Sequence, residues 1–300
     1  MDEKKRISET AFMTRNEKIF NMVMVTVGII ITILSLYPIY YVVIASLSRP
    51  LYVEGGEVMF WLKSPTIASY MVAAKKPGIW TAYANTIFYT AAGVLVNMFF
   101  TATMAYALSK KQLIFKKFFT LLTVFTLWFN AGIIPTYVNF VDFNLIDTRA
   151  AILFGFAINT YNLIILKSFF EQLPESIEEA AIIDGARNLS IFWRIYLPLS
   201  KPALATVGMF YAVSRWNGYF WTMSLLTSDS KVPLQVFLKK MIVDKVSNET
   251  DSAILTTASL SSPTTVIYAT IVISIIPMLI VYPFVQKYFK SGATIGAVKG

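Results

Sequence analysis

Six apolar segments, each about twenty residues or longer, set the strongest limit on how this chain folds. They run at roughly 19–47, 82–108, 118–140, 150–166, 203–226 and 265–285. A helix of this length matches the hydrocarbon thickness of a bilayer, and a helix satisfies its own backbone hydrogen bonds there. The sequence therefore predicts an all-α, polytopic membrane protein with six transmembrane helices.

The composition agrees with a membrane protein and excludes several kinds of functional site. Of the 300 residues, 56% are hydrophobic and 14% are charged, and the chain contains no cysteine and no histidine. Disulfides, zinc sites of the usual kind and triads that need an imidazole base are therefore excluded. No phosphate-binding G-x-x-x-x-G-K-[ST] loop occurs either. We expect no catalytic residues and no metal site, and any ATP with its Mg²⁺ would be bound by another subunit.

The net charge of +9 follows the topology of a membrane protein and does not indicate nucleic-acid binding. With the amino terminus inside, sixteen basic residues fall in the inner segments and nine in the outer loops, as the positive-inside rule requires. We therefore expect cytosolic residues 1–18, a six-helix domain at 19–286 and a cytosolic tail at 287–300. Within the six-helix domain, we expect a cytosolic loop at 168–201 and an outer loop at 227–264. Membrane lipid would surround this domain.

The cytosolic loop has the pattern of a helix, a break and a second short helix. Glu179 lies early in the first helix, where the helix dipole favours negative charge, and Ala180 and Ala181 give that helix a smooth face. Gly185 can adopt the positive φ that ends a helix. From the residues alone, the loop is either an ordinary connector or a helical knob that seats in a partner.

Twelve positions of this loop match the EAA loop of ABC-importer permeases. They are Glu179, Ala180, Ala181, Asp184, Gly185, Ala186, Phe192, Ile195, Leu197, Pro198, Leu199 and Pro202. The chain thus resembles that family, in which the loop carries a coupling helix that docks on the ATPase. The resemblance implies an ATPase contact through Glu179, Ala180, Ala181, Asp184, Gly185, Ala186, Phe192 and Pro198.

Further motifs extend the resemblance along nearly the whole chain. They are N-T-I-F-Y-T at 85–90, G-I-I-P-T-Y at 132–137, L-I-D-T-R at 145–149, W-N-G-Y-F at 216–220, P-L-Q at 233–235 and G-A-V-K-G at 296–300. The chain is similar to the maltose-type (MalG-like) permeases of carbohydrate uptake, and within them to the LplC/YtcP oligosaccharide subgroup.

Membership would imply a type I ABC-importer permease fold in a bacterial plasma membrane. The implied partners are a second homologous permease, two ATPase subunits and an extracellular solute-binding protein that delivers an oligosaccharide. The tail residues Val298, Lys299 and Gly300 would form a second ATPase contact.

One charged residue, Arg215, lies inside an apolar segment, and such a residue must face a partner, carbonyl groups or water. Aromatic and amide side chains lie around it, as in a sugar-binding surface. The predicted substrate path is Asn85, Asn130, Arg215, Trp216, Asn217, Tyr219 and Trp221. The alternatives are a structural arginine with interfacial aromatic residues, and asparagines that join helices.

Two other functions remain open at this point. An ABC permease for another polar solute, such as glycerol phosphate, would have the same cytosolic loop. An ion-coupled secondary transporter would need carboxylates within the membrane, and all seventeen acidic residues lie outside the six apolar segments. The second function is therefore disfavoured.

Overall fold

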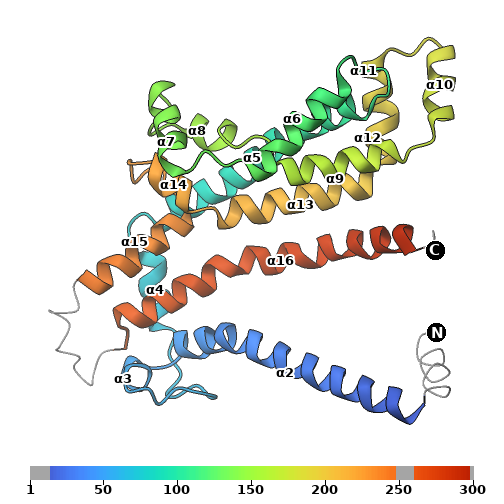
Figure 1. Ribbon diagram of the computed structural model, residues 1–300. Coiled ribbons are helices and arrows are strands. Elements are labelled where there is room, and N and C mark those ends of the chain that lie inside the picture. The colour runs from blue at the N-terminus through green and yellow to red at the C-terminus, as the bar shows by residue number, and fades with distance from the viewer. Residues whose placement is uncertain (1–13, 248–259, 298–300) are drawn as a thin grey trace. The chain divides into compact units, whose positions relative to one another are not determined.

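The computed structural model describes residues 14–247 and 260–297, and all regular structure within these ranges is helical (Figure 1). The helices are α2 (Arg15–Ser46), α3 (Pro50–Glu54), α4 (Ala68–Lys75), α5 (Ile79–Ser109), α6 (Lys116–Trp128), α7 (Ile133–Asp142), α8 (Arg149–Phe154), α9 (Thr160–Glu171), α10 (Glu175–Ile183), α11 (Asn188–Ile191), the π-helix η1 (Phe192–Tyr196), α12 (Leu197–Leu199), α13 (Lys201–Asn217), α14 (Phe220–Leu225), α15 (Leu234–Ser247) and α16 (Pro263–Ala297). The expected all-α class is confirmed for this part of the chain.

Among the described residues, three helices are long and apolar enough to cross a bilayer: α2, α5 and the Pro263–Ile280 part of α16. A fourth candidate is the pair α6 and α7, which meet at a bend of 117°. The remaining two apolar segments of the sequence each form two shorter helices, α8 with α9 and α13 with α14. The number of six spans therefore stays a prediction.

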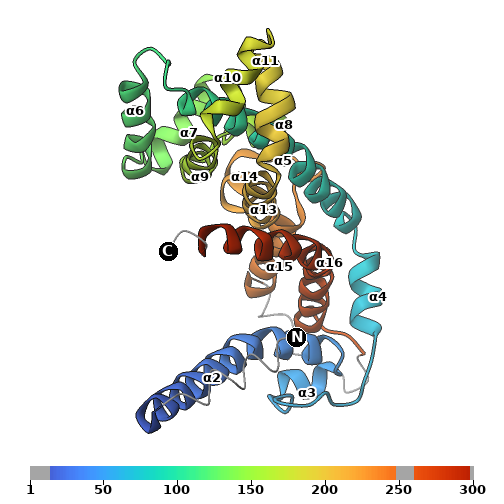
Figure 2. The ribbon, with the colours of Figure 1, turned by 90° about the vertical axis from the view of Figure 1, so that its right-hand side faces the viewer.

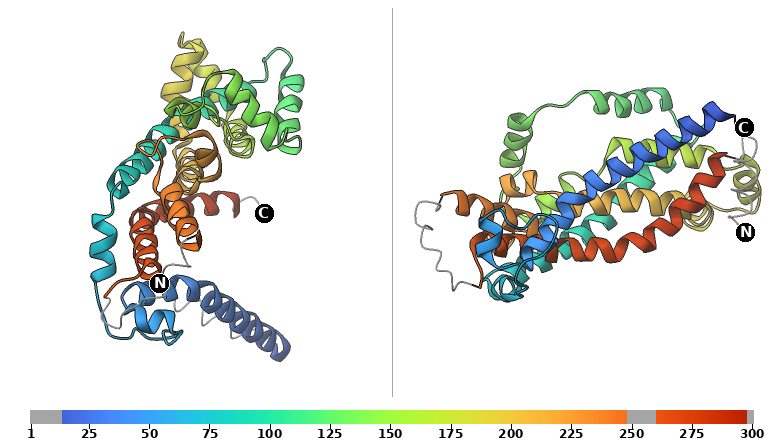
Figure 3. Two further views of the ribbon diagram at one scale, coloured as in Figure 1. Left: turned by 90° about the vertical axis from the view of Figure 1, so that its left-hand side faces the viewer. Right: turned by 90° about the horizontal axis from the view of Figure 1, so that it is seen from below.

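The chain divides into two compact units. The first comprises residues 1–73 and 248–272. A capping box of Thr14 and Glu17 starts α2, which runs on as one uninterrupted helix (Figure 3). The carboxyl end of α2 packs on the following segment, with Ile44 and Val58 buried. Ser69 donates a hydrogen bond to Thr265 at 2.9 Å and so ties α4 to the start of α16.

The second unit comprises residues 74–247 and 273–300, and its centre is formed by α5, α9 and α13, which pack on one another. Figure 2 looks along α9 and α13. Small residues of α5, among them Ala102 and Ala105, allow close helix approach. They pack with Leu163, Leu166 and Val207 in a core that excludes solvent.

A break separates α6 from α7 in the stretch that contains Asn130, Gly132 and Pro135. Gly132 has φ of +88°, which a residue with a side chain rarely adopts. The Oδ1 of Asn130 accepts a hydrogen bond from the Gly132 N–H at 2.9 Å. Pro135 lies in the first turn of α7, where its missing N–H needs no partner in the helix.

Candidate functional site

A backbone break between α8 and α9 is the centre of the candidate site. Thr148 caps the start of α8 and Asn159 caps the start of α9, each accepting a hydrogen bond from a backbone N–H. Gly155 follows the last residue of α8, and this position has no room for a side chain, because a Cβ would lie 2.4 Å from the Phe140 ring. The break leaves carbonyl groups free of helical partners in an apolar segment, where each needs a donor.

Arg215 of α13 supplies several of these donors. Its Nε donates to the Oδ1 of Asn97 at 2.9 Å, and its Nη2 donates to the carbonyls of Leu153 and Phe156, both at 3.2 Å. Its Nη1 donates to the carbonyl of Ile152. The guanidinium therefore lies at the carboxyl end of α8, where the helix dipole favours a cation.

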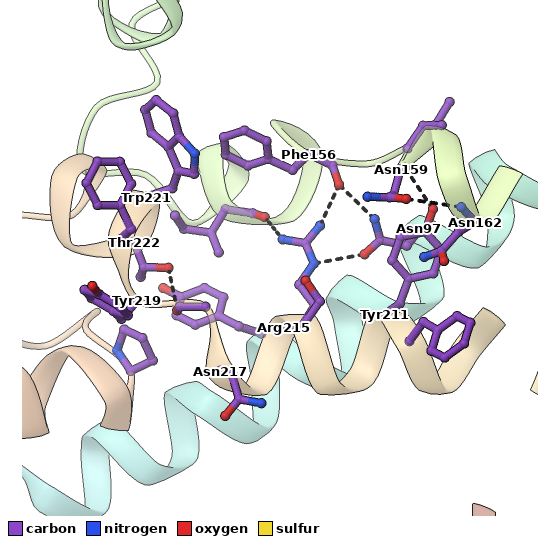
Figure 4. Close-up of a pocket in the computed structure, with 18 of the residues that line it drawn as sticks. Asn97, Phe156, Asn159, Asn162, Tyr211, Arg215, Asn217, Tyr219, Trp221 and Thr222 are labelled. Atoms are coloured by element: carbon purple, nitrogen blue, oxygen red, sulfur yellow. Dashed lines mark hydrogen bonds between the residues drawn. The ribbon is translucent and has the colours of Figure 1, made fainter. Parts of the chain in front are cut away.

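Two further side chains complete the contacts of the break (Figure 4). The amide nitrogen of Asn97 donates to the carbonyls of Phe156 and Ala157 at 2.9 and 2.7 Å. The Tyr211 hydroxyl accepts a hydrogen bond from the Asn159 N–H at 2.9 Å and lies 2.6 Å from the Thr101 hydroxyl. Side chains of α5 and α13 therefore fix the shape of the break from two sides.

A pocket of about 820 Å³ opens beside this network. Its lining combines aromatic rings with amide and hydroxyl groups, a mixture that suits the apolar faces and hydroxyl edges of sugars. The lining residues are Tyr89, Asn97, Ile152, Phe156, Ile158, Asn159, Tyr161, Asn162, Phe210, Tyr211, Ser214, Arg215, Asn217, Gly218, Tyr219, Phe220, Trp221, Thr222 and Pro233.

Four of the seven predicted substrate-path residues lie in this lining, and they are Arg215, Asn217, Tyr219 and Trp221. Figure 4 shows Asn217 turned away from the guanidinium of Arg215, and its amide donates to the Val213 carbonyl of its own helix at 3.0 Å.

The other three predicted residues lie elsewhere. Trp216 is buried and its ring meets the ring of Tyr83 edge-on. Asn85 is buried and donates to the carbonyls of Ser230 and Val232 at 2.8 and 3.1 Å, which ties α5 to the loop between α14 and α15. Asn130 lies in the break before α7.

Sequence reasoning missed the contribution of α9 to the pocket. Asn159, Tyr161 and Asn162 line the pocket, and the N-T-Y-N pattern at 159–162 carried a signal, since polar side chains at membrane depth face protein or water.

On the opposite end of the second unit from α8 and α14, the loop after α9 carries α10 (Figure 1). Gly185 has φ of +79° and follows directly after the α10 cap, so the predicted break is confirmed. No side chain of α10 is buried, and Ile183 is 85% exposed. The predicted second helical piece starts at Asn188, and its Ile191 and Phe192 are buried.

The remaining coupling residues divide by exposure. Glu179, Ala180, Asp184, Gly185 and Pro198 are exposed, Ala181 and Ala186 are half-buried, and Phe192 is buried. Their role as an ATPase contact stays a prediction. Val298, Lys299 and Gly300 lie outside the described residues.

Glu178 of α10 contacts the end of α5. Its Oε1 lies 2.5 Å from the Lys110 Nζ, and its Oε2 accepts a hydrogen bond from the Tyr196 hydroxyl at 2.6 Å. Burial opposes ionisation of Glu178, but the ion pair with Lys110 and the hydrogen bond from Tyr196 outweigh it and hold the pKa of this carboxyl below its ordinary value. Burial and the adjacent carboxylate raise the pKa of Tyr196.

A second carboxylate, Asp147, joins the α7–α8 turn to the loop between α14 and α15. It accepts hydrogen bonds from the Lys231 ammonium at 2.7 Å, the Ser228 hydroxyl at 2.5 Å and the backbone N–H of Thr227 at 3.1 Å. The hydrogen bonds from Lys231 and Ser228 hold the pKa of Asp147 well below its ordinary value. This clamp fixes the loop that leads to Pro233 in the pocket lining.

Two proteins of Bacillus subtilis (strain 168) are similar to this chain over most of its length. The polygalacturonan/rhamnogalacturonan transport system permease protein YtcP is 35% identical over 283 residues, which is 94% of this chain and 99% of that protein. Protein LplC is 36% identical over 267 residues, which is 89% of this chain and 90% of that protein.

A solved structure has a similar fold. It is a chain of a bacterial ABC transporter involved in the import of the acidic polysaccharide alginate. The two chains are 46% identical and superpose with a TM-score of 0.86, covering 93% of this chain and 99% of the other. The family described as binding-protein-dependent transport system inner membrane component matches residues 118–294. The chain therefore belongs to this family and is a permease component of a binding-protein-dependent ABC importer.

Proposed function

We propose that this permease imports an oligosaccharide, with Asn217, Tyr219 and Trp221 among the residues that contact it. The observation that carries the proposal is the pocket beside the α8–α9 break, where aromatic rings alternate with amide and hydroxyl groups. Such a lining stacks on sugar faces and hydrogen-bonds to hydroxyl groups. The names of YtcP and of the alginate transporter, which both refer to polysaccharides, support the same substrate class.

The charge of the pocket favours an anionic oligosaccharide. Arg215 is the one charged side chain in its described lining, and no carboxylate is present there to repel an acidic sugar. The donors of Arg215 are engaged by the break, so its contribution to the sugar is the positive potential of the guanidinium. Oligosaccharides of uronic acids are the substrates that we would test first.

The topology that fits this function has six spans and both termini in the cytosol. Residues 1–18 and 287–300 would be cytosolic, residues 19–286 would form the transmembrane domain, and 168–201 would be the loop that meets the motor. The three broken pairs of helices, α6 with α7, α8 with α9, and α13 with α14, would each count as one span. The break contacts of Arg215 and Asn97 support this, since they satisfy carbonyls that could not otherwise lie in lipid.

In the proposed cycle this chain catalyses no covalent step. A solute-binding protein would deliver the sugar to the outer face of the chain and a second, homologous permease. Two cytosolic ATPase subunits would bind ATP and Mg²⁺, and α10 would seat in one of them. The exposed apolar side chains of α10, such as Ile182 and Ile183, support this contact. Val298, Lys299 and Gly300 would add a second contact.

Uptake by the reconstituted complex tests the substrate. The permease pair, the ATPases and the binding protein are placed in proteoliposomes, and labelled oligogalacturonate, oligoalginate, maltotriose and glycerol phosphate are compared. We expect ATP-dependent and binding-protein-dependent uptake of an acidic oligosaccharide. Uptake of glycerol phosphate alone would replace the sugar proposal with that of another polar solute, and uptake driven by an ion gradient without ATP would overturn the importer cycle.

Disulfide crosslinking tests the coupling contact, because the chain contains no cysteine. Ala181→Cys is combined with one cysteine in the docking cleft of the ATPase. We expect a crosslink whose yield changes when ATP is added. An intact complex that gives no crosslink at Ala181 or at its neighbours would mean that α10 does not seat in that cleft.

A further inference from the structure

Four side chains from three elements fasten α10 to the cytosolic end of α5. Lys110, directly after α5, lies 2.5 Å from Glu178 of α10. The ammonium of Lys110 also lies 4.1 Å from the ring centre of Tyr106 and 4.3 Å from that of Tyr196. Tyr196 donates to Glu178, and the hydroxyl of Tyr106 donates to the Asn188 carbonyl at 3.0 Å. We call Lys110, Glu178, Tyr106 and Tyr196 the brace.

The brace is partly removed from water, which distinguishes it from an ordinary surface ion pair. The side chains of Lys110 and Glu178 are 18% and 22% exposed, while the neighbouring pair of Lys111 and Glu175 is 77% and 60% exposed. An exposed pair contributes little because water and salt screen it. A shielded pair with cation–π contacts on both sides is stronger, and removal of one partner leaves an uncompensated charge.

The helix to which the brace is attached also reaches the pocket. α5 is one uninterrupted helix from Ile79 to Ser109, and no proline lies within it. Asn97, on the same helix, lies about 20 Å from Lys110 at the usual rise of 1.5 Å per residue. Asn97 holds both Arg215 and the carbonyl of Phe156, which belong to the pocket lining.

We propose that Lys110 and Glu178 are positioning residues that make α10 and α5 move as one body. A displacement of α10 by its partner would then reach the α8–α9 break through α5 and Asn97. This proposal rests on the proposed coupling role of α10. It adds a defined mechanical route, because a rigid helix transmits a shift along its axis without intermediate rearrangement.

Neutralisation of the brace tests the route. Lys110→Met and Glu178→Gln are assembled with the partner permease, the ATPases and the binding protein, and uptake is measured per ATP hydrolysed. We expect this ratio to fall on the order of two- to thirty-fold, the usual range when a coupling network is cut, while the complex still assembles. The matched controls Lys111→Met and Glu175→Gln should leave the ratio unchanged.

A crosslink separates rigid coupling from mere stability. In the variant that carries both Lys110→Cys and Glu178→Cys, we expect a low uptake per ATP before treatment and recovery of the ratio with a short thiol crosslinker. Continued loss after complete crosslinking would overturn the proposal, because it would mean that α10 must move relative to α5. A wild-type ratio in Lys110→Met and Glu178→Gln would overturn it equally. Absence of ATP-dependent uptake by the wild-type complex would instead defeat the importer function itself.

Discussion

Arg215 is held by backbone groups and by one amide, and no carboxylate pairs with it among the described residues. Its donors meet the carbonyls of Ile152, Leu153 and Phe156 and the amide of Asn97. A charged arginine in an apolar segment is therefore matched by partial negative charges at a helix end. The residue lines the pocket and also holds the break, so its loss should affect both.

We expect Arg215→Met to lower the free energy of unfolding by roughly 2–4 kcal/mol, since each buried carbonyl left without a donor costs about 1–3 kcal/mol. Thermal unfolding of the detergent-purified complex measures this. Asn217→Ala is the control, because its amide bonds only to its own helix; it should weaken sugar binding with little change in the unfolding midpoint. An Arg215→Met protein as stable as wild type would show that other groups satisfy the break.

The close passage of Arg215 over α5 gives a second prediction. A Cβ at Gly93 would lie 3.0 Å from the Arg215 Nε and 3.1 Å from its Cδ. A Cβ at Gly208 would lie 3.7 Å from the Met98 sulfur, its nearest neighbour. The arginine cannot move aside without losing its carbonyl contacts.

Gly93→Ala should therefore lower the unfolding midpoint. Gly208→Ala lies within a helix, and its Cβ would meet Met98 only at an ordinary contact distance. It should raise the midpoint slightly, because alanine favours a helix by about 0.5–1 kcal/mol over glycine. Differential scanning calorimetry or a dye-based melt compares the two variants. Equal shifts for both would mean that Arg215 is free to yield at Gly93.

The sequence predicts that Arg215 and Asn85 need partners at membrane depth, but it does not identify those partners. Arg215 bonds to backbone carbonyls of a break 59 residues earlier in the chain, and carbonyls carry no side-chain signature. The sequence left two roles possible for Asn85: a contact with the substrate, or a contact that joins two helices. The structure places its amide on the carbonyls of Ser230 and Val232, which fits the second alternative.

Among the elements, the turn between α7 and α8 depends on one ionised carboxylate. Asp147 adopts φ of +54° and accepts hydrogen bonds from Ser228 and Lys231. The cost of this left-handed conformation is offset by the bonds to the loop between α14 and α15. The negative charge of Asp147 therefore contributes to holding this turn against that loop, beside the backbone bond from the Asp147 N–H to the Leu225 carbonyl.

The pH dependence of this clamp follows from the lowered pKa of Asp147. Its stabilisation is fully present above the unfolded pKa, about 3.9, and is lost as the pH falls through the still lower folded pKa. Asp147→Asn should therefore melt below wild type by a constant amount from pH 5 to 8, and the difference should shrink below pH 4. A difference that grows toward low pH would contradict this assignment.

Local signals in the sequence predict some elements well and others poorly. Gly185 predicts the end of α10, and Asn130 with Gly132 predicts the break before α7, because both depend on local backbone preferences. The breaks after α8 and α13 were not predicted. Gly155 is required by the ring of Phe140, a contact between segments that only the folded chain creates.

On the scale of the whole molecule, the exposed apolar side chains and the length of the helices both indicate a membrane protein. Which loops lie on which side of the membrane is a separate question. Leu189, in α11, is 69% exposed, and Asp229 lies in the loop before α15 with its side chain 87% exposed. The proposed topology places these two residues on opposite sides of the membrane.

Cysteine labelling tests this topology in a chain that has no native cysteine. In intact spheroplasts, Asp229→Cys should react with a membrane-impermeant maleimide, and Leu189→Cys should react only after the membrane is opened. Unsubstituted chain provides the background. Labelling of Leu189→Cys from outside would invert the topology and remove α10 from contact with a cytosolic motor.

The break between α8 and α9 also sets an order of events during synthesis. Asn97 precedes Phe156 in the chain, whereas Arg215 follows it by 59 residues. A ribosome that adds about 5–20 residues per second therefore delivers Arg215 some 3–12 s after the carbonyls that it will hold. During that interval Asn97 is the side chain of the network already present to bond to the break. The carbonyls of Ile152 and Leu153 obtain their donor only when Arg215 of α13 has been synthesised.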